Sequence, residues 1–235
     1  MKLTADVLNS AISHLNALKE RELVLRDLKL PAIENLGVTK DLNDTIDFSN
    51  NDLRVLGNFP RLIRLQHLLL ANNRINKIES NLAEFLPNLT TLILTDNSIQ
   101  ELGDLEALAK FKRLTFLSLA DNPVTKKQYY RLYLIHKLPR LRVLDFKKIK
   151  QKEREEANTL FVENGVENEL GQSISDTKSS NTFEVGEGLS AAQKQKALSK
   201  EEQLKIKEAL KQATSLDEIS RLEQLLKAGQ MPKGN

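Results

Sequence analysis

Apolar residues recur along the chain in a nine-residue pattern, Leu-x-x-Leu-x-Leu-x-x-Asn. The pattern occurs almost unaltered at 65–73, 89–97 and 114–122, and degenerate copies flank these three on both sides. The Asn positions and their substitutes lie at Leu28, Asn51, Asn73, Asn97, Asn122 and Ile149, at steps of 23, 22, 24, 25 and 27 residues. Self-similarity at this period predicts stacked structural repeats rather than one irregular globular core.

The period is that of leucine-rich repeats, each of which adds one short strand and a return connection to a curved stack. We therefore predict an α/β fold, a solenoid or horseshoe with a parallel sheet on its concave side. Within each strand the leucines point inward, and the Asn turns the chain away from the sheet, where its side chain can satisfy buried backbone groups. We interpret Asn51, Asn73, Asn97 and Asn122 as scaffold residues for this reason.

The two ends of such a stack need covers, because the first and last repeats would otherwise expose their cores. At the N-terminus, Thr4 can cap a helix whose apolar residues, from Val7 to Leu18, recur at steps of three and four. At the C-terminus, a helical segment at 129–135 leads to a last strand at 138–146 and a charged helix from about 150 to 161. We predict one repeat domain, residues 1–163, with a helical cap at each end.

The composition changes beyond the repeat domain. Residues 164–197 are dominated by Gly, Ser, Asn, Glu and Lys with little periodicity, which is typical of a flexible linker. Capping-box patterns that start at Ser199 and Ser215 then predict two short helices within 198–229, and 230–235 is expected to be a disordered tail. The sequence leaves open whether these helices dock on a partner or remain loose.

The variable positions beside the inward leucines face the concave side and form rows across the repeats. Leu69, Ile93, Phe116 and Val143 form an apolar band there, which is typical of a protein interface, and the groove suits an amphipathic helix. We predict a partner-binding face made of Val24, Asp47, His67, Leu69, Ile93, Phe116, Ser118, Val143 and Asp145. The two aspartates are expected to pair with basic residues of the bound helix. The alternative is that loops or the C-terminal segment of the same chain cover the band.

The formal net charge of +3 neither requires nor excludes nucleic acid, so the distribution of basic residues matters more. Lys19, Arg21 and Arg26 gather at one end of the predicted horseshoe, and seven Lys and Arg residues between 140 and 154 gather at the other. Such patches can bind a phosphate backbone. Glutamates dilute the second cluster, and no stacking aromatics are interleaved. These residues alone favour a solvated helix face, with a weak, non-specific RNA contact as the alternative.

No catalytic constellation is visible in the sequence. The chain has no Cys, its three His residues lie in separate elements, and it lacks a phosphate-binding Gly-rich loop and a metal-ligand spacing. We therefore expect no enzymatic activity, no metal and no cofactor. The lack of Cys fits a reducing compartment. Without an apolar N-terminal region or a run of about 18 apolar residues, the chain is expected to be intracellular and soluble, with no membrane contact.

Several strings between and within the repeats are more specific than the repeats themselves. They are Lys2-Leu3-Thr4-Ala5, Ile46-Asp47-Phe48-Ser49-Asn50-Asn51, Asn122-Pro123-Val124-Thr125 with Tyr130-Arg131-Leu132-Tyr133, and Arg142-Val143-Leu144-Asp145-Phe146 followed by Lys152-Glu153-Arg154. With these strings the chain resembles the U2 small nuclear ribonucleoprotein A-prime family of leucine-rich repeat spliceosomal proteins. The resemblance covers residues 2 to about 161 and resumes weakly at 215–216 and 222–232. The linker matches nothing recognisable.

This resemblance implies a non-enzymatic, nuclear scaffold in pre-mRNA splicing. It implies a partner with an RNA-recognition motif, of the B-double-prime type, whose helix docks on the concave face, together with other spliceosomal proteins. It also implies that the pair holds a stem-loop of the U2 small nuclear RNA, mainly through the partner. Candidates for phosphate contacts on this chain are Lys19, Arg21, Arg26, Lys147 and Lys150. The alternative is a leucine-rich repeat regulatory subunit of a protein phosphatase, which would not explain the Lys-Glu-Arg end unit.

Overall fold

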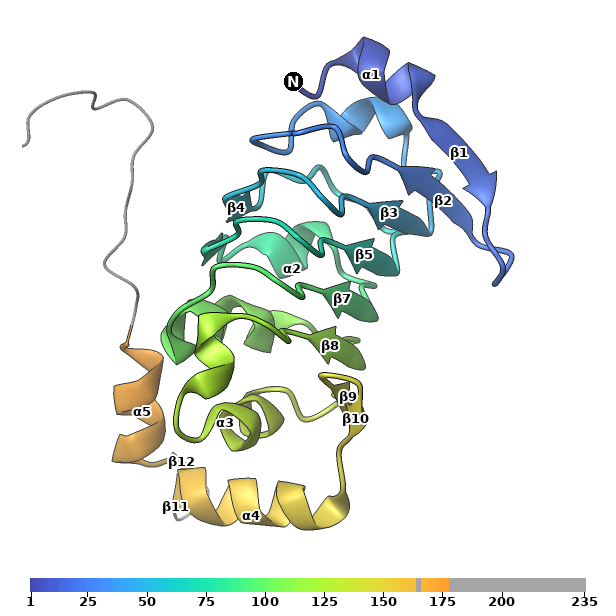
Figure 1. The fold of residues 1–235 in the computed structure, drawn as a ribbon. Helices are drawn as coiled ribbons and strands as arrows, with labels where there is room; N and C mark the ends of the chain where they lie inside the picture. Colours follow the sequence, from blue (N-terminus) through green and yellow to red (C-terminus); the bar gives the residue numbers. More distant parts are fainter. Residues whose placement is uncertain (164–165, 178–235) are drawn as a thin grey trace, which may run out of the picture. The chain divides into compact units, whose positions relative to one another are not determined.

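The computed structural model describes residues 1–163 and 166–177. Its main feature is an eight-stranded sheet in the order β1-β2-β3-β5-β7-β8-β9-β10 (Figure 1). Six of these strands are parallel and come one from each repeat: β2 (Arg21–Val24), β3 (Thr45–Asp47), β5 (His67–Leu69), β7 (Thr91–Ile93), β8 (Phe116–Ser118) and β9 (Val143–Leu144). The predicted leucine-rich repeat solenoid with a parallel sheet is confirmed.

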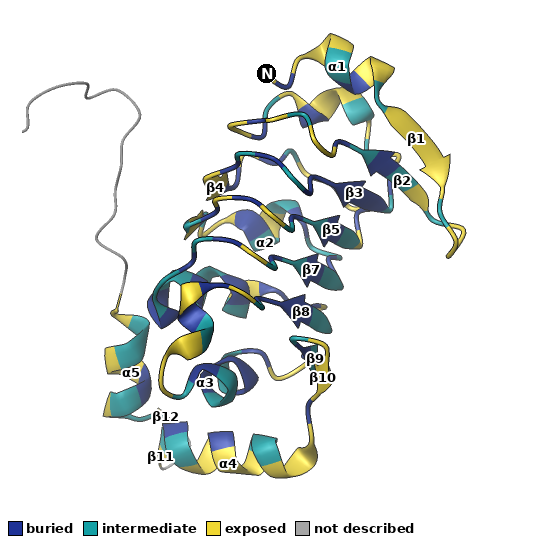
Figure 2. Ribbon diagram, viewed as in Figure 1, coloured by how far each residue is buried: buried dark blue, intermediate teal, exposed yellow. Residues whose placement is uncertain are grey.

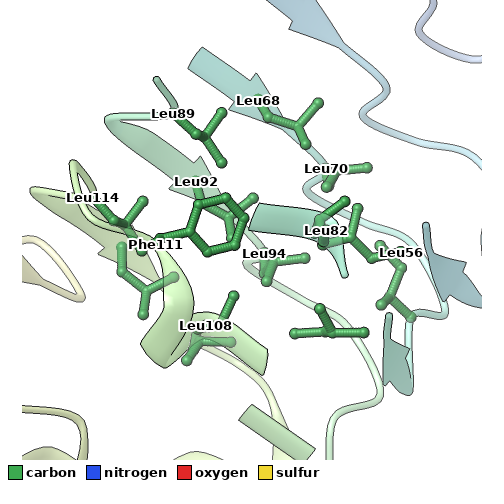
Figure 3. Packing of buried hydrophobic residues seen from close by; sticks show 14 of the residues in the cluster. Leu56, Leu68, Leu70, Leu82, Leu89, Leu92, Leu94, Leu108, Phe111 and Leu114 are labelled. Carbon is green, nitrogen blue, oxygen red and sulfur yellow. The ribbon is translucent and has the colours of Figure 1, made fainter. Parts of the chain in front are cut away.

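The inward leucines of successive repeats stack into one continuous core. Leu68, Leu92 and Leu117 are fully buried at the middle of their strands, and each is aligned with the next across the parallel register. Figure 3 shows this stack around Leu92, with Phe111 packed beside Leu92 and Leu114. Each fully buried leucine contributes about 1.5–3 kcal/mol relative to exposure. The sheet is therefore fixed by its inner face, which leaves the outer face free to vary.

A ladder of buried Asn side chains joins each repeat to the one before it. The Asn51 Nδ2 donates to the carbonyl oxygens of Leu25 and Phe48, both at 2.8 Å, while its Oδ1 accepts from the Leu30 backbone N–H at 3.0 Å. Asn73, Asn97 and Asn122 repeat the same connections one repeat further on. The predicted scaffold role of these four residues is confirmed.

The residue directly before each Asn of the ladder, and before Leu28 at the equivalent position, adopts a left-handed backbone conformation. These residues are Asp27, Asn50, Asn72, Asp96 and Asp121, with φ between 54° and 61°. Asn and Asp tolerate this region better than other residues with a Cβ, which explains why the repeats use them at the turn. The turn residues place acidic and amide side chains at the edge of the sheet where the strands end.

Short connections cover the side of the stack opposite the main sheet. They are the two-stranded sheet of β4 (Val55–Leu56) and β6 (Lys77–Ile78), the 3₁₀ helices η1 (Leu36–Thr39), η2 (Leu102–Lys110) and η3 (Pro123–Lys126), and the α-helices α2 (Leu82–Phe85) and α3 (Tyr130–Lys137). Their apolar anchors, among them Leu82, Leu105, Leu108 and Phe111, are buried as the sequence predicts.

The helix of the N-terminal cap is shorter than predicted. Helix α1 covers only Ala5–Ser10, with the Thr4 hydroxyl accepting from the Val7 N–H. The chain then forms β1 (Ile12–Leu15), which pairs antiparallel with β2, so Ile12 and Leu15 are 68% and 65% exposed (Figure 2). The spacing of apolar residues at three and four positions fits a helix. The unpaired edge of β2, however, forms backbone hydrogen bonds with Ile12–Leu15 as a strand. The prediction of a helix up to Leu18 was wrong.

The last repeat does not continue the pattern of the others. Strand β9 ends at Leu144, Asp145 and Phe146 both adopt left-handed backbones (φ 51° and 61°), and β10 (Lys147–Lys148) returns antiparallel to β9. Two consecutive residues with positive φ form the tight turn that suits a two-residue hairpin. The prediction that a single last strand covers 138–146 was wrong, because the strand begins only at Val143 and reverses after Leu144.

The C-terminal cap extends beyond the predicted boundary at residue 163. It consists of α4 (Gln151–Phe161), the hairpin β11 (Val162–Glu163) and β12 (Val166–Glu167), and α5 (Glu169–Ser175). Gly103 in η2 permits the close approach of α5, because a Cβ there would meet the carbonyl oxygens of Thr177 and, at 2.7 Å, Ser175. Residues 166–177 of the predicted linker thus form β12 and α5. The two helices predicted within 198–229, and the tail at 230–235, lie outside the described residues.

Candidate functional site

The outer face of the sheet carries two rows of side chains, which together form the concave face. Across the parallel strands Glu22, Thr45, His67, Thr91, Phe116 and Val143 align in the first row, and Val24, Asp47, Leu69, Ile93 and Ser118 align in the second. This is the register that the sequence predicts. The identity of each side chain on this face is therefore set by its place in the repeat.

The predicted apolar band on the concave face is continuous. Leu69 and Ile93 are neighbours in the second row, and Phe116 and Val143 are neighbours in the first row. All four side chains are half-buried. The band crosses from one row to the other between β7 and β8. Partly exposed apolar surface of this kind is typical of a protein interface.

A fifth apolar side chain, Phe146, extends the band at its C-terminal end. Its ring is 66% exposed and meets Phe116 edge to face, with the ring centroids 5.6 Å apart and the planes at 71°. Sequence analysis missed this residue, because Phe146 occupies the position of an inward leucine in the repeat pattern. Asp145 is the sequence feature that could have indicated a turn here, because Asp is common in turns.

Asp47 and Ser118 are the most buried members of the predicted partner-binding face. Both are buried, at 3% and 0% exposure. The Asp47 carboxylate accepts from the Ser49 N–H at 2.8 Å, and the Ser118 and Thr95 hydroxyl oxygens are 2.8 Å apart. Their polar atoms are used within the chain, so these side chains support the concave face from within.

Asp145 is also engaged within the chain. Its Oδ1 accepts from the Leu119 N–H at 2.7 Å, and its Oδ2 accepts from the Tyr130 hydroxyl at 2.8 Å. Burial, reinforced by this carboxylate, raises the pKa of Tyr130, so the phenol stays protonated and keeps donating. Both carboxylates are thus engaged within the chain, and the pairing of Asp47 and Asp145 with basic residues of a bound helix stays a prediction.

The N-terminal end of the concave face is polar. The His67 Nε2 lies 2.9 Å from the Glu20 Oε1, and the Thr45 hydroxyl donates to the Glu20 Oε2 at 3.1 Å. Glu20 thus holds the His67 ring in a fixed position beside the apolar band. Val24, in the second row, is half-buried. His67 can offer a partner one oriented polar contact, which an apolar band cannot supply.

The predicted phosphate-binding residues lie at opposite ends of the sheet. Lys19, Arg21 and Arg26 belong to the β1–β2 hairpin and its continuation, whereas Lys147 and Lys150 follow β9. All five are exposed. Arg26 also contacts Asp47, with 3.4 Å between its Nε and the carboxylate Oδ2. At about 4.8 Å per strand, the six steps from β2 to β10 separate the two groups by roughly 29 Å.

The guanidinium group of Arg131 stabilises the C-terminal end of the concave face. The Arg131 Nε donates to the Glu153 Oε1 at 2.6 Å, and its Nη1 donates to the Leu144 carbonyl oxygen at 3.2 Å. The hydrogen bond from Arg131 lowers the pKa of Glu153. This pair joins α3 and α4 to the end of β9. The hairpin that carries Phe146 and Lys147 is therefore held on a rigid support.

No metal site or catalytic cluster is formed by the described residues. Within residues 1–163 and 166–177, no group of three or more His, Cys, Asp or Glu side chains is arranged to hold a metal ion. None of the described helices is long and apolar enough to cross a membrane.

Comparison with known proteins adds independent findings. A family model described as "Leucine-rich repeat" matches residues 1–174. The chain is 50% identical over 196 residues to the U2 small nuclear ribonucleoprotein A′ of Homo sapiens, covering 83% of this chain and 75% of that protein. It is 51% identical over 186 residues to the protein of the same name from Neurospora crassa, covering 79% and 73%. A crystal structure of the Drosophila melanogaster SNF/U2A′ complex matches with a TM-score of 0.69 and 49% identity, covering 74% of this chain and 97% of that one.

Proposed function

The chain belongs to the U2 small nuclear ribonucleoprotein A′ family of leucine-rich repeat spliceosomal proteins, and on this premise we propose that its concave face binds an RNA-recognition-motif protein of the B-double-prime type. The two proteins then hold a stem-loop of the U2 small nuclear RNA during pre-mRNA splicing in the nucleus. The role of this chain is that of a non-enzymatic scaffold. The similar Drosophila protein is seen in a complex with SNF, which supports an assembly of this kind.

The observation that carries the proposal is the apolar band with its aromatic end. Leu69, Ile93, Phe116 and Val143 are half-buried, and Phe146 is mostly exposed beside Phe116. An amphipathic helix lying across β5 to β9 would cover these side chains with its own apolar face. Aromatic side chains near the centre of an interface commonly supply much of its affinity. Val24 and His67 would contact the same helix at its polar end.

The RNA contact is the weaker part of the assembly. Lys19, Arg21 and Arg26 at one end, and Lys147 and Lys150 at the other, are exposed cations beside the concave face. They are suited to phosphate groups and carry no means of reading bases, so base recognition would belong to the partner. Their contribution should fall as salt rises.

The test is calorimetric binding of the full chain to a B-double-prime-type RNA-recognition domain, with and without the stem-loop RNA, at two salt concentrations. Phe116→Glu should lower affinity for the protein partner at least about 100-fold, because it places a charge in the desolvated centre of the band. Val55→Glu is the matched control, since Val55 is an exposed apolar residue of β4, away from the main sheet. It should bind as the parent protein does.

The RNA arm uses Arg21→Gln combined with Lys150→Gln. Pairing with the protein partner should be unchanged, while the salt dependence of the RNA-containing complex should become shallower by about two counterions. An unchanged slope would remove these residues from the RNA surface. Absence of any pairing with the parent chain would reject the proposed function and make a protein phosphatase the next partner to test.

A further inference from the structure

A cavity of about 400 Å³ lies in the loops that precede three successive strands. Pro87, Lys112 and Pro139 line it from the same position in their repeats, four residues before β7, β8 and β9 respectively. Phe111 and Leu138 complete its apolar floor, and both are buried. None of the concave-face residues lines this cavity, so it is a separate surface of the solenoid.

The rim of the cavity carries cations without counter-ions. Lys112, Arg113 and Arg140 line it and are exposed, and none of the three forms an ion pair with another described residue. No carboxylate lines the cavity. Unpaired guanidinium groups beside apolar surface favour a carboxylate ligand, since Arg binds carboxylates through two parallel hydrogen bonds.

In an earlier repeat, the arginine at the equivalent position is paired with a carboxylate of this chain. Arg64 lies three residues before β5, and its Nε and Nη2 donate to both carboxylate oxygens of Asp44, at 2.8 and 3.0 Å. Asp44 lies one residue before β3, in the preceding repeat. Their hydrogen bonds lower the pKa of Asp44 and raise that of Arg64. The repeat before Arg64 therefore supplies a carboxylate to the arginine at this position.

The later repeats keep the arginine and lack the acid. Arg113 and Arg140 occupy the position of Arg64, three residues before β8 and β9. The residues that correspond to Asp44 are Thr90 and Thr115, whose hydroxyls donate to backbone carbonyl oxygens instead. Two neighbouring repeats thus present the same cation with no internal acceptor.

We propose that this cavity is a docking site for an acidic peptide that carries an apolar side chain. The carboxylates take the place of Asp44 at Arg113 and Arg140, and the apolar side chain enters between Pro87 and Pro139 above Phe111. A duplex RNA would meet the same cations but leave the apolar floor uncovered, and its rigid backbone does not enter a concave site of this size. The charge complementarity and the apolar floor together favour the peptide.

The experiment measures binding of the full chain to a fluorescein-labelled peptide with one Leu between two blocks of Asp and Glu. Replacing that Leu with Ser should lower affinity about tenfold, because the apolar floor then stays exposed to water. Arg113→Gln with Arg140→Gln should also lower affinity at least about tenfold. The same variant should still bind the protein partner of the concave face, which separates this site from the proposed function.

A second variant tests the site without removing a cation. Thr115→Asp restores the acid of the earlier repeat and should occupy Arg140, so peptide affinity falls about tenfold. Gln66→Asp is the matched control, because it adds the same charge at the same repeat position, but the residue that corresponds to Arg64 there is Asn88. It should leave affinity within about twofold.

Unchanged peptide binding in Arg113→Gln/Arg140→Gln and in Thr115→Asp would overturn the proposal. Binding that ignores the Leu-to-Ser replacement would also overturn it, since the site would then be a plain basic patch. Loss of binding to a 12-base-pair RNA duplex in these variants, without loss of peptide binding, would assign the surface to nucleic acid and reject the peptide.

Discussion

The interior repeats and the last repeat satisfy buried backbone groups with different side chains. In the interior, each ladder Asn satisfies backbone groups of its own repeat and of the one before, as Asn97 does for Leu94 and Leu70. In the last repeat Ile149 stands at the position of the Asn, and guanidinium groups satisfy carbonyl oxygens at other positions of that repeat. Arg154 donates to the carbonyl oxygens of Pro139 and Leu141, at 2.8 and 2.5 Å, and Arg131 donates to that of Leu144.

The difference determines where the chain goes next. An Asn side chain is short and belongs to the turn itself, so it turns the chain into another repeat. Arg131 and Arg154 come from α3 and α4, so the carbonyl oxygens they satisfy also hold those helices in place. The strand is then free to reverse at Asp145 and Phe146. A solenoid can therefore end where its repeat acceptors are satisfied from a cap rather than from the next repeat.

The largest expected effect is in the ladder. Asn97→Leu removes two donors and one acceptor from buried backbone groups, because its Oδ1 also accepts from the Ile75 N–H at 2.9 Å. At about 1–3 kcal/mol per unsatisfied buried group, the free energy of unfolding should fall by about 3 kcal/mol or more. Urea denaturation followed by circular dichroism measures it. Asn76→Leu, outside the ladder, is the control. An equal fall in the free energy of unfolding in both variants would show that the ladder Asn residues stabilise the fold no more than other Asn residues do.

Removing a guanidinium should have a smaller and more local effect. Arg154→Met keeps much of the side-chain volume but leaves two carbonyl oxygens without their donor, at a cost of about 1.5–3 kcal/mol for charge-assisted bonds. Hydrogen exchange should show α4 losing protection while the strands of the interior repeats keep theirs. Uniform loss of protection across all repeats would contradict the separation of the cap from the interior.

The turn that carries Phe146 should show opposite effects on stability and binding. A residue with a Cβ at φ 61° costs about 1–2 kcal/mol, and the Phe116 ring contact returns about 0.5–1.5 kcal/mol. Phe146→Gly should therefore leave the free energy of unfolding unchanged or raise it by up to about 1 kcal/mol. Affinity for the concave-face partner should drop about tenfold or more. A large loss of stability in this variant would mean that Phe146 is a core residue.

The smallest expected effect is a pH dependence confined to the cap. His136 is stacked near Phe161 and faces Glu167, Lys137 and Glu106, and burial lowers its pKa below the ordinary value of 6.5. The unfolded chain therefore binds the proton more readily, so stability is full above that value and decreases as pH falls below it. Between pH 7.5 and 5.5 the loss should be below about 1 kcal/mol.

Thermal unfolding at the two pH values measures this loss, and His136→Asn should abolish most of it. Asp44 and Glu153 have lowered pKa values, so their contributions are present above the ordinary values of 3.8 and 4.5 and decrease only in more acidic solution. Asp44 and Glu153 therefore add no pH dependence of stability between pH 5.5 and 7.5. A pH dependence that the variant retains in full would assign the effect to another group.

The interior of the fold could be predicted from the sequence because its signal repeats. One period fixes the strands, the inward leucines, the ladder and the alignment of Leu69 with Ile93 on the concave face. The ends could not be predicted in the same way, because long-range contacts decide them. Asp145 is diverted by Tyr130, which lies 15 residues earlier, and Ile12 joins the open edge of β2 although its spacing also fits a helix.

The candidate site divides along the same line. The apolar band was predicted from side-chain type and row position, and both are local properties. The burial of Asp47 and Ser118 was not, because it involves side chains of adjacent repeats, Arg26 and Thr95. Phe146 was missed because an unbroken Leu-x-x-Leu-x-Phe pattern gives no sign that the strand has reversed.

The Asn ladder also has a consequence for the order of folding. Its bonds between repeats join residues about one repeat apart, so any two adjacent interior repeats can nucleate the stack, and growth proceeds from them toward both ends. The last repeat cannot be completed by this propagation, because it waits for Arg131 and Arg154 to arrive from α3 and α4. The hairpin that presents Phe146 is thus assembled late. An incompletely synthesised or partly unfolded chain would display its repeats before it could bind.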